Sequence, residues 1–449
     1  MYQTLIFYQG RGDWNLPSLI VVGCQWGDEG KGKIVDYLSS QADYVVRYQG
    51  GSNAGHTINV GGETYRLRLL PSGVLHRKKL VIANGVVLDP SVLLKEISDL
   101  TAKGYKPDLA LSDRAHVTLS YHQMLDAAEE KFKGDLRSGT TLRGIGPTYT
   151  DKVARYGIRT ADLLDLELLK QKISQNTILK RRMLKSVYES DAQINEKELL
   201  DGCVRFGQDL RPYMTDTSVL LNDALDEGKR ILFEGAQGLL LDIDHGVYPV
   251  GTSSNTVAGG VCTGAGVGPT KINNTLGVVK AYTSRVGAGP VPTELTDDLG
   301  SKLQEKGNEF GTVTGRRRRC GWIDAVALRF ASRVNGLTGI ALTKIDTLGG
   351  FDPVKICIEY KVDGRTVRDQ PASLHEYSNC RPVYEEMKGW PDLPNSEWAA
   401  IAKKGYDSLP SQARDYVEKI EEITKSPVKI VSVGEAREAT IYRSGAWAS

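Results

Sequence analysis

The sequence has little that would indicate a zinc centre, a disulfide framework or a membrane span. Its six cysteines are scattered along 449 residues without a C-x-x-C pair, so we expect reduced thiols, no zinc site and a cytoplasmic location. No apolar run approaches the ~18 residues that a membrane helix needs. The formal net charge is only +2, which gives no overall attraction to nucleic acid or membranes and leaves any basic site local.

Alternating strand and helix patterns predict an α/β protein with a large, mostly parallel central sheet. Short apolar segments such as 19–22, 44–47 and 339–343 read as strands, and 90–103 reads as a helix that starts with a proline. The segments 57–60 and 64–70, joined through two glycines, look like a hairpin. We also expect a P-loop-like phosphate site, a helical insertion and a smaller α+β segment. The predicted divisions are a leader or tag-like extension at 1–17, a nucleotide-binding core at 18–115 and 205–275, a helical insertion at 116–204, and a last α/β part at 276–449 packed on the same core.

A glycine-rich turn at 23–33, GCQWGDEGKGK, is the strongest functional signal. It lies between a strand and a helix pattern, an arrangement that points backbone N–H groups at a phosphate, and Lys31 and Lys33 add positive charge. The spacing differs from G-x-x-x-x-G-K-[ST], and a carboxylate, Asp28, lies within the loop. An acid among phosphate-binding amides suits metal binding or proton transfer, whereas the alternative is a plain glycine-rich turn.

The segment Thr343-Lys344-Ile345-Asp346 follows an apolar strand and resembles the T-K-x-D arrangement with which GTP-binding proteins read guanine. Asp346 would accept hydrogen bonds from the ring N1–H and the exocyclic amine, and the stem of Lys344 would cover the ring. Adenine would leave Asp346 poorly satisfied, at a loss of roughly 1–3 kcal/mol. Alone, the tetrapeptide could equally be a strand end with surface charges.

Other polar loops admit two interpretations each. His56, in the glycine-rich loop 50–57, is a candidate acid or electrophile or else fixes a turn. The loops 139–147 and 234–238 could bind anions or serve as ordinary turns. The arginines 316–319, preceded by the hydroxyl-bearing loop 311–315, favour a small-anion clamp over a nucleic-acid patch.

These blocks, taken together and in this order, resemble the adenylosuccinate synthetase family of IMP–aspartate ligases. The resemblance covers nearly the whole chain, from about 19 to 440. Its stretches are QWGDEGKGK, RYQGGSNAGHT, NGVVL, RGIGPTY-x-DKVAR, FEGAQG, LDIDHG-x-YP, TSSNT, RVGAGP-x-PTE, TGRRRR-x-GW and LTKID.

The resemblance implies a reaction in which GTP, IMP and L-aspartate give GDP, phosphate and adenylosuccinate, the first committed step from IMP to AMP. Asp28 would take the N1 proton of IMP, so that its O6 attacks the γ-phosphate and forms 6-phosphoryl-IMP. His56 would act as the acid, and Lys31 and Gln237 would be further catalytic residues. Mg²⁺ would be bound by Asp28 and the carbonyl of Gly55.

The family pattern also implies binding residues for each substrate. Those for GTP are Gly27, Asp28, Glu29, Gly30, Lys31, Gly32, Lys33, Gly55, His56, Thr57, Arg318, Lys344, Ile345, Asp346, Ser432, Val433 and Gly434. Those for IMP are Asp28, Lys31, Asn53, Ala54, Gly55, His56, Thr141, Arg155, Gln237, Thr252 and Arg316. Those for aspartate are Thr312, Val313, Thr314, Gly315, Arg316 and Arg318.

The resemblance further implies a homodimer in which Arg155 reaches the neighbouring active site. On the residues alone, Arg155 reads as a surface charge. Leu142 stands where the family usually has glycine, and Val313 replaces a hydroxyl residue of the aspartate loop. The main alternative is a GTPase-type switch without ligase activity, but a switch has no need for a base such as Asp28 inside the loop. A nucleic-acid-binding protein is disfavoured by the near-neutral charge, and a dinucleotide-dependent dehydrogenase by the glycine spacing.

Overall fold

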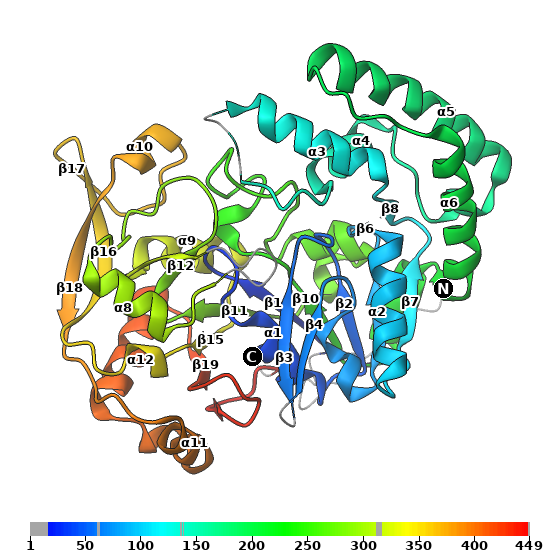
Figure 1. Ribbon diagram of the computed structural model, residues 1–449. Helices are drawn as coiled ribbons and strands as arrows, with labels where there is room; N and C mark the ends of the chain where they lie inside the picture. Colours follow the sequence, from blue (N-terminus) through cyan, green and yellow to red (C-terminus); the bar gives the residue numbers. More distant parts are fainter. Residues whose placement is uncertain (1–16, 61–62, 135–136, 138, 311–316, 448–449) are drawn as a thin grey trace, which may run out of the picture.

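Ten strands form one sheet through the centre of the molecule (Figure 1). The computed structural model describes residues 17–60, 63–134, 137, 139–310 and 317–447. The strand order is β20-β19-β15-β11-β1-β10-β2-β5-β7-β9, and neighbours are parallel except for the antiparallel pair β19–β20. The strands are β1 (Ser18–Gly23), β2 (Tyr44–Arg47), β5 (Lys79–Ile82), β7 (Asp108–Ser112), β9 (Met214–Thr215), β10 (Ile231–Glu234), β11 (Asn274–Lys280), β15 (Gly339–Thr343), β19 (Val428–Ser432) and β20 (Thr440–Tyr442).

The predicted fold class is confirmed, and several predicted strands agree with the structure residue by residue. The segments 44–47 and 339–343 coincide with β2 and β15. These strands read as continuous apolar runs because a parallel sheet is covered on both faces. The predicted strand 64–70 is shorter than expected, because the carboxylate of Glu96 takes the amides of Leu69 and Leu70 and ends the ladder at Leu67.

Helices cover both faces of this sheet, and α3 to α6 gather in a separate layer beside it (Figure 1). This layer has its own hydrophobic cluster, which includes Leu125, Leu169 and Cys203. The predicted helix 90–103 is α2, whose first turn is capped by the side chain of Asp89. The helices are α1 (Lys31–Ser39), α2 (Pro90–Ala102), α3 (Ser120–Phe132), α4 (Ile145–Ala154), α5 (Leu166–Arg182), α6 (Glu196–Leu210), α7 (Thr217–Asp226), α8 (Asp298–Lys306), α9 (Ala325–Asn335), α10 (Leu374–Ser378), α11 (Asn395–Lys404) and α12 (Ser411–Thr424).

Smaller sheets surround the central one. The predicted hairpin near 57–70 is formed by β3 (His56–Val60) and β4 (Glu63–Leu67). At one edge of the molecule, β14 (Ile323–Asp324), β16 (Val354–Val362), β17 (Arg365–Val367) and β18 (Arg381–Met387) form the smaller α+β segment (Figure 1). Strands from both 18–115 and 276–449 belong to the central sheet, and the exact domain limits stay a prediction. Among the described residues, no helix has the length and apolarity needed to cross a membrane.

The carboxyl ends of the central parallel strands define one functional edge. There β1 leads into the phosphate loop, β10 ends at Glu234, β15 leads to Lys344 and β19 ends at Ser432. Open parallel sheets bind ligands at this edge, because loops from neighbouring strands converge there. The separate sequence motifs are therefore brought together by the topology of one sheet.

Candidate active site

The turn between β1 and α1 is braced by its own glutamate. Gly27 and Gly30 adopt left-handed φ values of 84° and 93°, which glycine reaches without strain. The Oε1 atom of Glu29 accepts hydrogen bonds from the amides of Gln25 at 3.0 Å and Gly27 at 2.9 Å. Its Oε2 atom lies 2.5 Å from Nζ of Lys31. Glu29 therefore fixes the loop from inside, while α1 begins with amides that are available to an anion.

Asp28 points out of this loop into the central cavity. Its backbone is left-handed, with φ 57°, and its side chain is 40% exposed. The Oδ2 atom lies 2.6 Å from a guanidinium nitrogen of Arg318. Asp28, Arg318 and His56 all line one cavity of about 390 Å³. The acid that the sequence singled out thus faces the same space as the candidate histidine.

His56 is held from behind by a buried carboxylate. Its Nδ1 atom contacts Glu234 directly and lies 3.3 Å from Oγ of Ser72. Ser72 in turn donates to Glu234 through its amide at 2.8 Å and its hydroxyl at 2.7 Å. Burial alone would raise the pKa of Glu234, but the charge and hydrogen bond of His56 hold that pKa below its usual range. A carboxylate that contacts Nδ1 fixes the orientation of the imidazole ring.

Amide and hydroxyl groups also line the cavity. Gln237 has a left-handed φ of 59°, and its Nε2 atom donates to Oδ1 of Asn53 at 3.2 Å. Its Oε1 atom is buried and has no hydrogen-bond partner among the described residues. Thr141 and Thr252 line the same cavity. A buried acceptor without a partner is costly, so Gln237 is suited to receive a donor from a ligand.

Arg318 is shared between Asp28 and a second, deeply buried acid. One of its nitrogens lies 2.8 Å from Oε2 of Glu309, whose Oε1 atom lies 2.7 Å from Nζ of Lys280. Burial would raise the pKa of Glu309, but Lys280 and Arg318 together lower it to about 2. Glu309 is therefore a permanent anion that fixes Arg318 at the cavity wall.

The segment 343–346 at the end of β15, which the sequence predicts to read guanine, lies beside the phosphate loop. Thr343 Oγ1 donates to the carbonyl of Glu29 at 2.6 Å, which joins the two segments directly. Beyond it, Lys344 adopts φ 63°, and its Nζ atom donates to the carbonyl of Gly307 at 3.2 Å. The Oδ1 atom of Asp346 is buried without a partner in the described structure, and burial raises the pKa of this carboxyl.

Comparisons with known proteins agree with this geometry. The family model described as adenylosuccinate synthetase matches residues 20–441. The adenylosuccinate synthetase of Carboxydothermus hydrogenoformans is 52% identical over 95% of this chain and 99% of its own length, and that of Streptococcus sanguinis is 49% identical over 97% and 100%. A solved structure of fully ligated adenylosuccinate synthetase from Plasmodium falciparum covers 95% of this chain and 100% of its own, with TM-score 0.87 and 37% identity.

This chain belongs to the adenylosuccinate synthetase family. It is a GTP-dependent ligase that joins IMP and L-aspartate into adenylosuccinate, with release of GDP and phosphate. The reaction passes through 6-phosphoryl-IMP and is the first committed step from IMP to AMP. The function and the enzyme class predicted from the sequence are therefore confirmed, and the GTPase-type switch is set aside.

Fourteen of the expected site residues share the one cavity. Nine others that the structure describes lie elsewhere: Glu29 inside the phosphate loop, Arg155 on the surface, and Lys33, Lys344, Ile345, Asp346, Ser432, Val433 and Gly434 beside the ends of β15 and β19. The expected residues that line the cavity are Gly27, Asp28, Gly30, Lys31, Gly32, Asn53, Ala54, Gly55, His56, Thr57, Thr141, Gln237, Thr252 and Arg318.

Part of the expected aspartate site lies outside the described residues. This applies to Thr312, Val313, Thr314, Gly315 and Arg316. The described residues continue from Arg317, which precedes the buried Arg318 of the cavity wall.

Arg155 does not line the cavity of its own chain. It caps the C-terminus of α4 in a left-handed conformation, φ 68°, and is exposed. Leu142, on the loop before α4, also has a left-handed φ, 57°, which explains why glycine suits that position in the family. Thr141, next to it, still faces the cavity.

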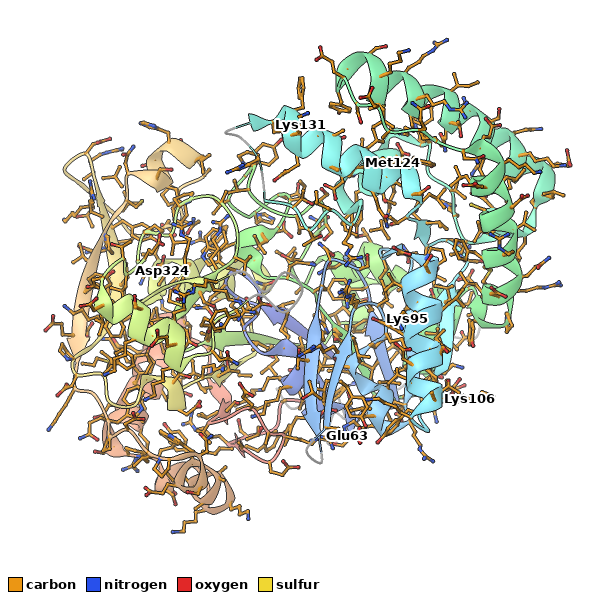
Figure 2. The ribbon with its side chains drawn as sticks, viewed as in Figure 1. Glu63, Lys95, Lys106, Met124, Lys131 and Asp324 are labelled. Carbon is orange, nitrogen blue, oxygen red and sulfur yellow. The ribbon has the colours of Figure 1, made fainter. Side chains whose placement is uncertain are left out.

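Sequence reasoning missed several residues of the site. Arg285 is buried, lines the cavity, and its guanidinium lies 3.7 Å from the ring centroid of Trp26; burial lowers its pKa to about 9. The acids Asp126 and Glu130 of α3 also line the cavity, and Figure 2 labels Met124 and Lys131 along the same helix. Arg285 stood in a recognised block, but nothing in a single sequence marks α3 as part of this wall.

Proposed function

We propose that Asp28 is the general base and His56 the general acid of this ligase. The observation that carries the proposal is that both side chains face one cavity, which the first residues of α1 also line without a side-chain cap on their amides. Asp28 takes the N1 proton of IMP, O6 attacks the γ-phosphorus of GTP, and the bond to the GDP oxygen breaks. The amine of aspartate then adds at C6, loses a proton and displaces phosphate, which leaves adenylosuccinate.

His56 and Lys31 serve the charge that develops on the transferring phosphoryl group. His56, fixed through Nδ1 by Glu234, turns its other nitrogen to the phosphoryl oxygens as a proton donor. Lys31 and the first amides of α1 add fixed positive charge that needs no rearrangement during the reaction. Gln237, whose Oε1 atom has no partner among the described residues, accepts from the purine or its amine.

We propose Mg²⁺ as the metal, held by the carboxylate of Asp28 and the carbonyl of Gly55. Among the described residues, no group of three or more His, Cys, Asp or Glu side chains could hold a metal. One carboxylate and one carbonyl oxygen fit Mg²⁺, which commonly takes one or two protein ligands together with phosphate oxygens and water. When bound, it would neutralise charge on the transferring phosphoryl group.

For the substrates, we propose three adjoining subsites. IMP lies against Asn53, Ala54, Thr141 and Thr252, and guanine lies against Lys344–Asp346 and 432–434. Aspartate binds Arg318 together with residues 312–316, as the family pattern implies. Within the protein, Arg318 pairs with Asp28. Arrival of the aspartate carboxylates would draw Arg318 away and release Asp28 for metal and proton.

We further propose a homodimer in which Arg155 completes the neighbouring site. Arg155 is exposed beside two apolar side chains, Val153 at 81% and Tyr156 at 40% exposure, and an apolar patch around a cation suits a second copy. Mixing inactive Asp28→Asn with inactive Arg155→Leu subunits should restore about a quarter of wild-type activity, since half the dimers would regain one intact site. No restored activity would mean that Arg155 does not act across an interface.

The cytoplasmic location stays a prediction, supported by six cysteines that form no disulfide.

The central experiment measures phosphate release from GTP with IMP and aspartate together, each alone, or neither. The proposed sequence of steps predicts release only when both are present. Equal release from GTP alone would mean that water, and not O6 of IMP, is the attacking group.

A further inference from the structure

Lys33 of α1 has all three of its ammonium protons engaged by one loop. Nζ donates to Oγ of Ser432 at 2.7 Å, to the carbonyl of Gly434 at 2.8 Å and to the carbonyl of Ala439 at 2.9 Å. An ammonium group has three donors and no acceptor. These bonds leave Lys33 nothing to offer a phosphate. Lys33 is also absent from the cavity wall that Lys31 lines.

Asp36, one helical turn further along α1, grips the same loop. Its carboxylate receives both arms of Arg437, with Nε at 2.6 Å from Oδ2 and Nη2 at 2.8 Å from Oδ1. His76 also approaches Oδ1, at 3.1 Å. Asp36 is buried, and a bidentate pair with arginine is among the more directional contacts in proteins. Positions three apart lie on the same side of a helix, so Lys33 and Asp36 form one clamp on 432–439.

The clamped loop borders the unsatisfied carboxylate of Asp346. The positive charge of Lys33 acts on Asp346 and lowers the pKa of its carboxyl, against the larger effect of burial. Oε1 of Glu435, in the loop, lies 3.7 Å from Nζ of Lys344. Within the loop, the amide of Val433 donates to the carbonyl of Ala439 at 3.0 Å. The shape of this loop is thus set from α1, and the groups it presents lie beside the acid that would read guanine.

We propose that Lys33 and Asp36 are positioning residues that shape the guanine pocket, and that Lys33 acts on GTP through the loop 432–439 and makes no contact with its phosphates. This inference rests on the base pocket proposed above. Helix α1 starts at the phosphate loop and holds the loop 432–439 along its side.

The test compares a nucleotide with a nucleoside. Binding of GDP and of guanosine is measured by calorimetry for the wild-type enzyme and for Lys33→Met. Loss of the three hydrogen bonds that shape the loop should weaken both ligands by the same factor, about tenfold or more. The KM for GTP should rise by a similar factor, while kcat and the KM for IMP change much less. If GDP weakens and guanosine does not, Lys33 contacts phosphate and the proposal fails.

Two further variants keep the test decisive. Arg437→Met removes the contact with Asp36 by changing the more exposed of the two partners. It should weaken the binding of guanosine and of GDP equally, by a few-fold. Arg443→Met is the matched control, because Arg443 secures the other end of β19 through the carbonyl of Val428 at 2.8 Å and should leave both affinities unchanged. Unaltered guanosine binding in both Lys33→Met and Arg437→Met overturns the clamp.

The base pocket itself is tested separately with Asp346→Asn. If that variant keeps full affinity for GDP, the pocket is misassigned, whatever the Lys33 result. If Asp346→Asn loses affinity and Lys33→Met does not, the pocket stands and only the clamp is wrong.

Discussion

The phosphate end and the base end of the proposed nucleotide site differ in whether their acidic side chains have hydrogen-bond partners. At the phosphate end, Glu29 accepts two backbone amides and pairs with Lys31, and Asp28 pairs with Arg318. At the base end, Asp346 keeps a buried oxygen without a partner among the described residues. The acids of the first end are paired within the protein, whereas Asp346 presents a buried acceptor that no described residue uses.

This difference separates acids that build the site from acids that read the substrate. A buried, fully hydrogen-bonded carboxylate stabilises the fold, and its removal leaves other groups unpaired. Burying a carboxylate oxygen that has no hydrogen-bond partner costs free energy, and a ligand that donates to this oxygen offsets the cost. Asp28 lies between the two cases, because its partner Arg318 is itself expected to turn to a substrate.

The largest expected effect is on turnover by Asp28→Asn. An amide cannot take the N1 proton, and loss of a general base commonly slows a reaction by about 10²–10⁴-fold. We expect kcat to fall by about a thousandfold or more, while GTP binding, followed by calorimetry, persists. Turnover near that of the wild-type enzyme would refute the assignment of Asp28 as base.

A large loss of stability is expected from Glu29→Gln, next to Asp28 in the chain. Glu29 is buried with Lys31, and breaking a buried ion pair by removing one partner costs about 3–5 kcal/mol. Denaturant unfolding should show this loss. The matched control is Asp99→Asn, which breaks the exposed pair with Lys95 and should change stability by less than about 0.5 kcal/mol. Equal effects of the two variants would show that Glu29 does not brace the loop.

This pair of neighbours also shows what the sequence could predict. The spacing of the loop identified Asp28, because an acid among phosphate-binding amides is unusual. The same pattern could not tell that Glu29 turns inward, since that depends on amides of the folded loop. The family pattern grouped both as GTP-binding residues, and the geometry gives them different tasks.

Contacts between distant segments were equally beyond prediction. The strand 339–343 was recognised residue by residue because a buried parallel strand is apolar throughout. The contact from Lys33 to Ser432 spans 399 positions of the chain and depends on β1 and β19 belonging to one sheet. Likewise, Glu309 and Lys280 surround Arg318 only after folding. Local patterns predict elements, whereas pairs of this kind are set by topology.

A moderate effect on GTP affinity is expected from Asp346→Asn, which tests whether the buried, unpartnered oxygen of Asp346 accepts hydrogen bonds from guanine. The asparagine cannot accept both guanine donors, so GTP should bind about tenfold to a hundredfold more weakly, with IMP nearly unaffected. Without ligand, the variant should be at least as stable as the wild-type protein at neutral pH.

The sign of the pH dependence follows from the raised pKa of Asp346. A folded-state pKa above the unfolded value means that the ionised carboxylate destabilises the free protein. This penalty is present above the folded pKa and disappears as the pH falls toward the unfolded value. Wild-type protein should therefore gain stability relative to Asp346→Asn on acidification. A constant difference between the two would show that Asp346 is not penalised by burial.

The smallest effect is expected from Leu142→Gly, which extends the comparison to the backbone. Gly27 and Gly30 hold left-handed φ values without strain, whereas Leu142 holds φ 57° at a cost of roughly 1 kcal/mol. Its side chain is 51% exposed, so replacing it removes little packing. We expect the free energy of unfolding to rise by about 0.5–1 kcal/mol and the KM for IMP to fall, because Thr141 next to it faces the cavity.

Gly336→Ala is the reverse control, since φ 59° there should make alanine destabilising by a similar amount. A loss of stability in Leu142→Gly would mean that the exposed leucine packs against another surface, which in the proposed homodimer is the second subunit.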